Sequence, residues 1–501
     1  MTLVGLDLNA TRARAVTGSA GDALQRAALE PPQPDLPLAL SLKGEATVGT
    51  AGLRLARRSP YLAQLCFLPE LGQPRRHGQE TAPEQRRLDG TSATVLLLER
   101  LFETFHPCKG IFCSVPPYLT TTQVGLLFSL SEEVGLPLRG VVSAPLAAAL
   151  AARASRTWTG TAIILDVDDH ALTVSALAAV GNELQLLEAR TLMRLGLRAW
   201  TERLLDALAD RCILQSRRDP RDCPAAEQAL FEQLDGVLDA WRAGQSVQVA
   251  FQATHWYQRL ALTPLDGAAC CAALARRALA EIAEVCTAPW PTGAPGVVLM
   301  TTAAARLPGL VAGVEASFAA WRAASSAASP VPSDDFGEGL LDEEEDDASA
   351  VEVLAPDALA RAAHALAVLV ERGDLPVGQL DVTAPLPVTA PADAGPVRLR
   401  YQGHEYLLDR SAFVLGWQPT CDLVFACDAY PTVSPRHCEI VCSTDVCTLH
   451  DRSRTGTFLN DEPVKGPTVL RAGDSIRLGS RGPVLRFLGG VIESRPVNSS
   501  A

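Results

Sequence analysis

The sequence predicts two folded domains of different classes: a duplicated α/β domain of two lobes over residues 1–373, and an all-β sandwich over residues 396–490. The α/β prediction depends on an internal repeat, because residues 4–25 and 163–185 resemble one another. The sandwich prediction depends on short apolar or alternating runs, which Gly, Pro, Asn and Asp interrupt at the spacing of an antiparallel fold. A Pro-rich segment at residues 374–395 lies between the two regions and predicts a semi-extended linker.

The two copies of the repeat share one order of elements. Each copy begins with an apolar strand that ends in Leu-Asp and one further residue, with the Asp at Asp7 in the first copy and at Asp166 in the second. A polar turn and a second strand follow, and a Gly-Asp or Gly-Asn turn then leads to a third strand that opens with Leu-Gln. Each copy is therefore predicted to be a β-meander, followed by mixed helices and strands. Two such halves predict two lobes with a cleft between them.

Further segments extend this pattern over the first 373 residues. They are the strand and turn Gly110–Tyr118, the segment Pro145–Leu150, the strand Val297–Met300 with the helix start Arg306–Gly309, and an Ala-rich helix over Ala355–Arg372. On these segments, the region resembles the nucleotide-binding domain of DnaK-type heat-shock chaperones, which has the actin-like ATPase fold. The resemblance implies a nucleotide cleft lined by Asp7, Thr11 and Asp166, with Asp7 orienting a magnesium-bound water.

The turns that would hold phosphate depart from that family. Phosphate loops are rich in Gly because backbone N–H groups must approach the phosphate without a Cβ atom in the way. Here the first turn reads Asn9-Ala10-Thr11, and the second reads Asp168-Asp169-His170-Ala171. Two carboxylates at the second turn would repel phosphate oxygens at close range. We therefore expect a pseudo-ATPase that needs no cofactor.

Two alternatives remain open for this region. In the first, ATP and Mg²⁺ still bind to the unusual turns and are hydrolysed slowly, under the control of the C-terminal domain. In the second, Asp7, Asp166, Asp168 and Asp169 together bind a hard cation without nucleotide. Ordinary polar turn residues would give the same pattern, so no metal site is predicted.

The C-terminal region places groups that suit phosphate binding in its predicted loops. Phosphate binding uses hydroxyls, guanidinium groups and backbone N–H donors. The motifs Val414-Leu415-Gly416, Val433-Ser434-Pro435-Arg436-His437 and Asp451–Asn460, followed by Leu470–Gly479, carry these groups in a fixed order. In this order and spacing they resemble a forkhead-associated (FHA) domain, a β-sandwich that binds phosphothreonine.

The resemblance divides the motif residues into two sets. It places Ser434 and Thr455 at phosphopeptide-binding positions, and the chemistry of the loops adds Arg436 and Arg454 to them; support of the fold is expected from Gly416, His437, Gly456 and Thr457. Two positions depart from the family, because Trp417 stands where an Arg follows the Gly, and Thr455 stands where an Asn is expected. Loss of that Arg removes a contact of about 1.5–3 kcal/mol, which Arg436 or Arg454 would partly replace. An FHA fold that docks a protein surface without phosphate therefore remains an alternative.

Three segments are predicted to lie outside the folded domains. Residues 327–349 are rich in Pro and Ser and then strongly acidic, which predicts a disordered insertion before the last helix of the first domain. The linker holds Thr383 and Thr389, two candidate phosphorylation sites. Residues 491–501 are expected to form a disordered tail.

Composition narrows the function classes. A net charge of −13 argues against general nucleic-acid binding, which needs Lys and Arg. No apolar run reaches the ~18–20 residues that span a bilayer, and the first residues lack the pattern of a signal peptide, so we expect a cytoplasmic protein without membrane contact. The 13 cysteines are expected to be reduced thiols. The C-terminal region has no paired C-x-x-C spacing, so no zinc site is predicted there.

Together these patterns predict an α/β duplicated actin-like ATPase fold of two lobes, followed by an all-β FHA sandwich. The expected function is a non-enzymatic signalling adaptor. Its partner would be a protein, and in the phosphate-dependent interpretation a Ser/Thr kinase or a substrate of one, phosphorylated on threonine.

Overall fold

The computed structural model divides the chain into two compact units, one formed mainly by residues 1–386 and the other by residues 387–501. The residues that the structure describes are 2–20, 23–73, 87–155, 158, 160–180, 183–253, 255–290, 295–327, 351–385, 398–401, 404–408, 412–426, 429–442, 447–460, 462–470 and 474–489. Most of the predicted acidic insertion at 327–349, the linker beyond Pro385 with Thr389, and the predicted tail at 491–501 lie outside these residues.

The first unit contains a seven-stranded sheet built on the first meander. Its order is β17-β9-β8-β1-β2-β3, with β4 paired to β2. The strands are β1 (Leu3–Leu8), β2 (Arg12–Gly18), β3 (Gln25–Arg26), β4 (Leu36–Pro37), β8 (Gly110–Val115), β9 (Leu138–Ser143) and β17 (Gly378–Leu380). β1, β2 and β3 pair antiparallel, whereas β8 and β9 run parallel to β1. The predicted meander is therefore present, with parallel strands added beside its first strand.

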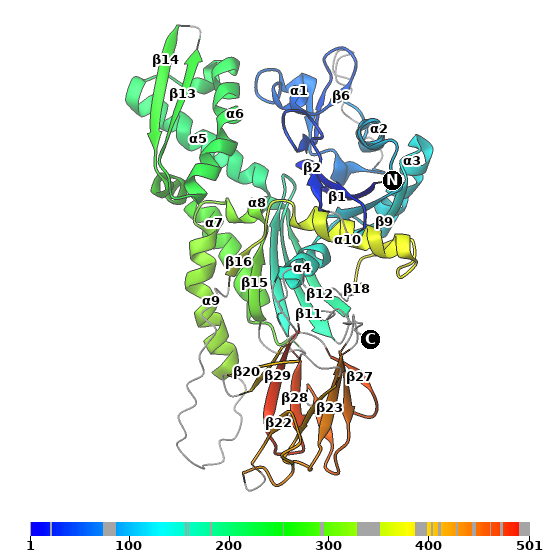
Figure 1. Cartoon of the computed structure of the whole chain (residues 1–501). Helices are drawn as coiled ribbons and strands as arrows, with labels where there is room; N and C mark the ends of the chain where they lie inside the picture. The colour runs from blue at the N-terminus through cyan, green and yellow to red at the C-terminus, as the bar shows by residue number, and fades with distance from the viewer. Residues whose placement is uncertain are drawn as a thin grey trace, which may run out of the picture. The chain divides into compact units, whose positions relative to one another are not determined.

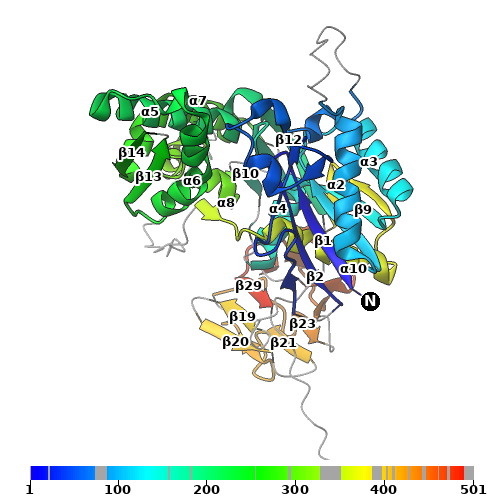
Figure 2. The same ribbon diagram turned by 90° about the horizontal axis from the view of Figure 1, so that it is seen from above.

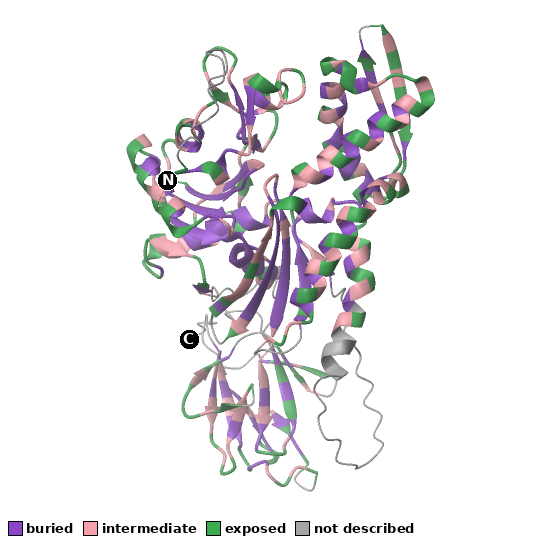
Figure 3. Ribbon diagram, turned by 180° about the vertical axis from the view of Figure 1, so that it is seen from behind, coloured by how far each residue is buried: buried purple, intermediate pink, exposed green. Residues whose placement is uncertain are grey.

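The second meander builds a sheet with the same plan. Its order is β16-β15-β10-β11-β12-β18. The strands are β10 (Thr161–Val167), β11 (Leu172–Val180), β12 (Glu183–Leu192), β15 (Pro295–Met300), β16 (Val351–Val353) and β18 (Thr383–Pro385). β10, β11 and β12 pair antiparallel, and β15 and β16 continue parallel to β10. The internal repeat is thus a repeat of topology, and Figure 3 shows that the central strands of both sheets are buried.

Helices and short strands surround the two sheets. The helices are α1 (Thr50–Leu53), α2 (Gly90–Phe105), α3 (Thr121–Val134), α4 (Ala144–Ser155), α5 (Leu197–Ser216), α6 (Pro224–Arg242), α7 (Pro264–Cys286), α8 (Thr302–Ala305), α9 (Leu310–Ala327) and α10 (Ala358–Arg372). A small sheet joins β5 (Ala39–Ser41), β6 (Thr47–Val48) and β7 (Ala63–Leu65), and a hairpin joins β13 (Val247–Ala253) and β14 (Trp256–Leu262). Figures 1 and 2 show the hairpin grouped with α5, α6 and α7. The predicted helix over 355–372 is α10, which packs on β1 and β8.

The first unit ends later than the sequence suggested. Residues 378–380 form β17, which pairs parallel with β9, and residues 383–385 form β18, which pairs antiparallel with β12. Ala384 is only 1% exposed, whereas Thr383 is exposed on β18. The predicted boundary at residue 373 and a linker over 374–395 are therefore wrong for these residues. The Pro-rich composition was misleading because Pro is tolerated at the ends of edge strands.

The second unit is a β-sandwich, as predicted for residues 396–490. One sheet has the order β20-β19-β29-β28-β25-β26, and the other has the order β22-β21-β23-β24-β27. The strands are β19 (Arg398–Tyr401), β20 (His404–Leu407), β21 (Ala412–Gly416), β22 (Leu423–Val424), β23 (Cys438–Cys442), β24 (Cys447–Asp451), β25 (Thr457–Leu459), β26 (Glu462–Pro463), β27 (Thr468–Val469), β28 (Ser475–Leu478) and β29 (Val484–Gly489). Alternate residues of both sheets, such as Leu415, Ile440 and Ile476, form one apolar core.

Two expectations from composition can be compared with the described residues. Cys421 and Cys438 are buried free thiols, but Cys447 is disulfide-bonded, so the prediction of reduced thiols throughout is wrong at that position. None of the described helices is both long enough and apolar enough to span a membrane.

Candidate functional site

The polar turns of the two meanders meet at the carboxylate of Asp168. Its Oδ1 atom accepts hydrogen bonds from the backbone N–H groups of His170 (2.9 Å) and Ala171 (3.0 Å) within its own turn. Its Oδ2 atom accepts from the backbone N–H of Ala10 (3.0 Å), in the turn of the first meander, and from the Tyr118 hydroxyl (2.5 Å). Asp168 is only 4% exposed. A carboxylate of the chain itself therefore occupies the N–H donors of both turns.

A second hydrogen bond joins the same two turns. The backbone N–H of Asp169 donates to Thr11 Oγ1 at 2.8 Å. Beside it, the rings of Tyr118 and His170 lie 4.8 Å apart between centroids. Burial, and next the adjacent Asp168 carboxylate, raise the pKa of the Tyr118 hydroxyl well above its usual value. Tyr118 therefore stays protonated and remains a donor to Asp168.

The two strand-end carboxylates predicted to lie together are close enough to affect one another. Burial, followed by the charge of Asp166, raises the pKa of Asp7 to about 7. Burial also raises the pKa of Asp166, although Asp166 Oδ1 accepts a hydrogen bond from the Thr301 hydroxyl at 2.7 Å. Burial, and then the charge of Asp168, raises the pKa of Asp169 to about 7. Within the described part of the chain, no cluster of three or more His, Cys, Asp or Glu side chains has the arrangement of a metal site.

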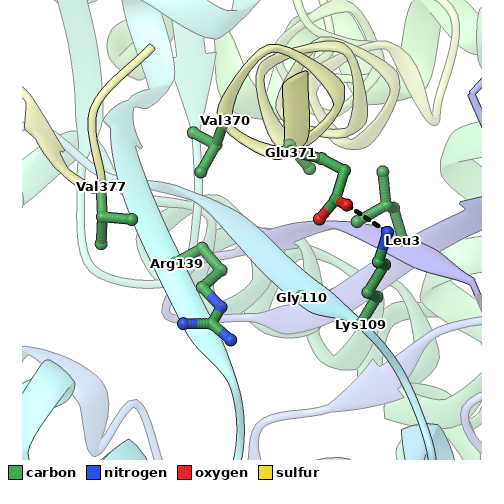
Figure 4. A pocket seen from close by; sticks show the side chains of 8 residues that line it. Leu3, Lys109, Gly110, Arg139, Val370, Glu371 and Val377 are labelled. Atoms are coloured by element: carbon green, nitrogen blue, oxygen red, sulfur yellow. Dashed lines mark hydrogen bonds and ion pairs between the residues drawn. The ribbon is translucent and has the colours of Figure 1, made fainter. Parts of the chain in front are cut away.

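A cavity of about 300 Å³ lies at the opposite end of the first sheet (Figure 4). Leu3 and Gly110, which begin β1 and β8, line it together with Arg139 and Val377. Lys109 forms an ion pair with Glu371 of α10 at its wall. Because Asp7 lies near the other end of β1, this cavity is separate from the turns that meet at Asp168.

In the second unit, the predicted loops are brought together at one end of the sandwich. Gly416 ends β21, and a Cβ atom on it would lie 2.2 Å from the carbonyl oxygen of Pro435. The next two N–H groups, of Trp417 and Gln418, donate to the carbonyl oxygens of Ser434 and Pro435 at 3.3 and 3.0 Å. Only glycine at position 416 therefore permits this approach of the two loops.

His437 holds the Ser434 loop in place. It is completely buried, its Nδ1 accepts the N–H of Ser434 at 2.9 Å, and its Nε2 lies 3.2 Å from the carbonyl oxygen of Gly456. Since a carbonyl can only accept, Nε2 carries the proton and the ring is neutral. Burial lowers the pKa of His437 below its ordinary value, which favours the same neutral form. His437 therefore braces the loop and is not itself exposed to a ligand.

The loop between β24 and β25 is fixed from both of its ends. Thr457 is completely buried and donates its hydroxyl to Asp451 Oδ1 at 2.7 Å, and the same oxygen accepts the N–H of Ser453 at 2.9 Å. Gly456 has a left-handed φ of 84°, and its N–H donates to Ser453 Oγ at 2.8 Å. Gly456 and Thr457 thus shape the loop that carries Arg454.

Among the predicted contact residues, Ser434 and Arg454 meet directly, whereas Thr455 faces a carbonyl. The N–H of Arg454 donates to Ser434 Oγ at 3.1 Å, which leaves the Ser434 hydroxyl proton free to donate elsewhere. The Thr455 hydroxyl donates to the carbonyl oxygen of Thr432 at 2.6 Å. The Thr455 hydroxyl therefore cannot donate this proton to a ligand, and it instead ties the β24–β25 loop to Thr432.

Two of the predicted contact residues present guanidinium groups at this end. Arg436 and Arg454 are exposed, and within the described part of the chain neither side chain forms a hydrogen bond or ion pair. Arg452, by contrast, is paired with Glu439 at 2.7 Å. Trp417, at the position where the motif has Arg, is 39% exposed.

Sequence reasoning missed several residues that build both sites. Asp451, Ser453 and Thr432 hold the loops of the sandwich, although the first two lie inside the motif that was recognised. Asp168 was interpreted as a group that repels phosphate, as a possible cation ligand or as an ordinary turn residue, but not as the acceptor that joins the two turns. Its hydrogen bond to Ala10 joins residues 158 positions apart, and no local pattern reports such a contact.

Comparison with known proteins identifies one region of the chain. The family model of the FHA domain matches residues 413–479, which include all four loop residues assigned to the phosphopeptide. No curated protein matches the chain. The second unit therefore contains an FHA domain, a module that mediates protein–protein interaction by binding phosphothreonine peptides.

Proposed function

We propose that the chain is a non-enzymatic adaptor. Its FHA domain docks a protein partner phosphorylated on threonine, such as a Ser/Thr kinase or a kinase substrate, and its first unit is a pseudo-ATPase that serves as a scaffold. The observation that supports phosphate recognition most directly is that two exposed arginines, Arg436 and Arg454, lie on the loops that carry the Ser434 hydroxyl, and neither guanidinium group has a partner among the described residues.

The chemistry of these groups suits a phosphate monoester. The Ser434 hydroxyl keeps its proton for a ligand because its oxygen already accepts the Arg454 N–H. A phosphate carries nearly two negative charges at neutral pH and accepts several hydrogen bonds. Each charge-assisted bond from a guanidinium group contributes about 1.5–3 kcal/mol, so two arginines can offset the arginine that Trp417 replaces.

The experiment compares phosphorylated and unphosphorylated ligands on the full chain. A degenerate peptide library with a fixed central phosphothreonine, and its threonine twin, are titrated, and enriched sequences are measured by calorimetry. We expect binding of the phosphorylated peptides only. Arg436→Ala or Arg454→Ala should weaken binding about tenfold to hundredfold, which corresponds to the bond energies above.

Arg452→Ala is the matched control, because this neighbouring arginine is already paired with Glu439. It should leave affinity nearly unchanged. Equal binding of the two libraries would contradict the proposal and would favour an FHA fold that docks proteins without phosphate.

The pseudo-ATPase part of the proposal rests on the turns of the first unit. The two sheets share the meander-plus-parallel plan that the resemblance to actin-like ATPases implies. A nucleotide phosphate placed at these turns would have to displace Asp168 from the N–H groups of Ala10 and Ala171. It would also meet the nearby carboxylates of Asp7 and Asp166. These residues do not fit a bound Mg·ATP.

Titration of the full chain with Mg·ATP, followed by a steady-state phosphate-release assay, tests this part. We expect neither saturable binding at millimolar nucleotide nor hydrolysis above background. Hydrolysis that Asp7→Asn abolishes would overturn the pseudo-ATPase proposal and establish the slow ATPase instead. Hydrolysis that survives Asp7→Asn would come from a contaminant.

A further inference from the structure

The turn between β28 and β29 belongs to the same loop cluster as the proposed phosphate site. The N–H of Gly479 donates to the carbonyl oxygen of Gly456 at 2.9 Å. Gly479 has a φ of 80°, and a Cβ atom on it would lie 2.9 Å from the side chain of Thr432. Thr455 donates to the carbonyl of that same Thr432. Residues 479–482 therefore pack against the residues that hold the Arg454 loop.

Arg477 holds this turn in place, and its guanidinium group is already used in contacts within the domain. Nη1 of Arg477 lies 2.8 Å from the carbonyl oxygen of Ser480 and 3.4 Å from that of Gly479. The same guanidinium lies over the ring of Phe458, 4.5 Å from its centroid. The N–H of Leu478 closes the turn on the carbonyl of Pro483 at 3.1 Å. Arg477 is thus a structural residue.

Arg481 is the cation that this turn presents to solvent. It is exposed, and among the described residues no hydrogen bond or ion pair engages its side chain. Arg436, Arg454 and Arg481 are thus three exposed arginines on neighbouring loops, and none has a side-chain partner among the described residues. Two carboxylates near these loops already contact the fold, since Asp422 accepts the N–H of Val414 and Asp451 accepts the hydroxyl of Thr457. In a chain of net charge −13, three arginines without a side-chain partner among the described residues therefore lie on neighbouring loops.

Three guanidinium groups exceed what one phosphate neutralises. A phosphothreonine carries about −1.5 to −2 charges at pH 7. We propose that Arg481 is a specificity residue that contacts an aspartate or glutamate of the bound peptide, so that the partner's docking segment is a phosphothreonine within an acidic sequence. This inference rests on the proposed function and adds the class of sequence that surrounds the phosphothreonine.

Two degenerate libraries test the proposal on the full chain. Both have a fixed central phosphothreonine; one carries Glu, and the other Gln, mixed in at the three positions on either side. Wild-type protein should prefer the Glu library by about tenfold at low salt, a preference that weakens as salt rises. Arg481→Gln should remove most of this preference and leave affinity for the Gln library unchanged.

Arg452→Gln, an exposed and ion-paired arginine of the same unit, is the control and should retain the preference. If Arg481→Gln lowers affinity for both libraries equally, or for neither, Arg481 does not have the proposed role. Either outcome leaves the proposal of phosphothreonine binding intact. Failure of wild-type protein to discriminate either library from its unphosphorylated twin overturns both this inference and the proposed function. Circular dichroism of each variant distinguishes loss of contact from loss of folding.

Discussion

Replacing Asp168 by asparagine changes one atom of a buried side chain that four donors approach. The carboxylate accepts from three backbone N–H groups and one hydroxyl. An asparagine at this position keeps one carbonyl oxygen and turns an NH₂ group toward the donors on its other side. The N–H of Ala10, which is completely buried, is then left without an acceptor. Each buried donor without an acceptor costs about 1–3 kcal/mol, and a bond to a charged group contributes about 1.5–3 kcal/mol, so Asp168→Asn should cost about 2–4 kcal/mol.

Urea unfolding of the full chain, followed by tryptophan fluorescence, measures this loss. Trp200 is completely buried in the same unit and reports its unfolding. Tyr118→Phe removes one of the four donors and should cost only about 1–2 kcal/mol. The double variant should be less destabilised than the sum of the two, because both changes act on one hydrogen bond. A free energy of unfolding for Asp168→Asn within about 0.5 kcal/mol of wild type would refute the reasoning, since surface substitutions give such values.

Three other perturbations follow from the structure. Since burial, and next a neighbouring carboxylate, raises the pKa of Asp7 to about 7 from an ordinary 3.8, the folded state binds the extra proton. Stability should therefore fall as pH rises from about 4 to 7, and Asp7→Asn should flatten this fall in denaturation curves measured across that range. Gly416→Ala should destabilise the sandwich by about 1–3 kcal/mol because its Cβ meets the Pro435 carbonyl, whereas Gly466→Ala, with open space around it, should be neutral in the same melts. Trp417→Arg should strengthen phosphothreonine peptide binding about tenfold in calorimetry, and unchanged affinity would show that this position does not face the phosphate.

Local patterns were sufficient to predict the central strands of the meanders. These strands follow from apolar runs of strand length, and in both copies a Leu-Asp pair lies near the end of the first strand, before a polar turn. In the sandwich, β21, β23 and β28 lie in short apolar or alternating runs bounded by turn residues, which is the local pattern on which the sandwich prediction depended. The motif residues Ser434, His437 and Thr457 lie in or beside the loops at one end of the sandwich, where His437 accepts the N–H of Ser434 and Thr457 donates to Asp451.

Long-range partners were the part that sequence reasoning could not supply. The Asp168 carboxylate could repel a ligand, or it could accept hydrogen bonds from N–H groups of the chain itself. Which of the two applies depends on the N–H groups near it, and one of them, that of Ala10, comes from the other sheet. Thr455 looked free to bind phosphate, but a carbonyl 23 residues away accepts its proton. The edge strands β17 and β18 were missed because two three-residue strands carry too little pattern, and their pairing with β9 and β12 is decided by tertiary structure.

Those two edge strands determine where the protein can be cut. A fragment that stops at residue 373 would lack the neighbour of β9 in one sheet and the neighbour of β12 in the other, and it would lose the buried Ala384. Unpaired sheet edges are templates for self-association. Such a fragment should therefore precipitate or form oligomers on expression, whereas one extended through Leu386 retains both protecting strands and is the version suited to purification and crystallisation.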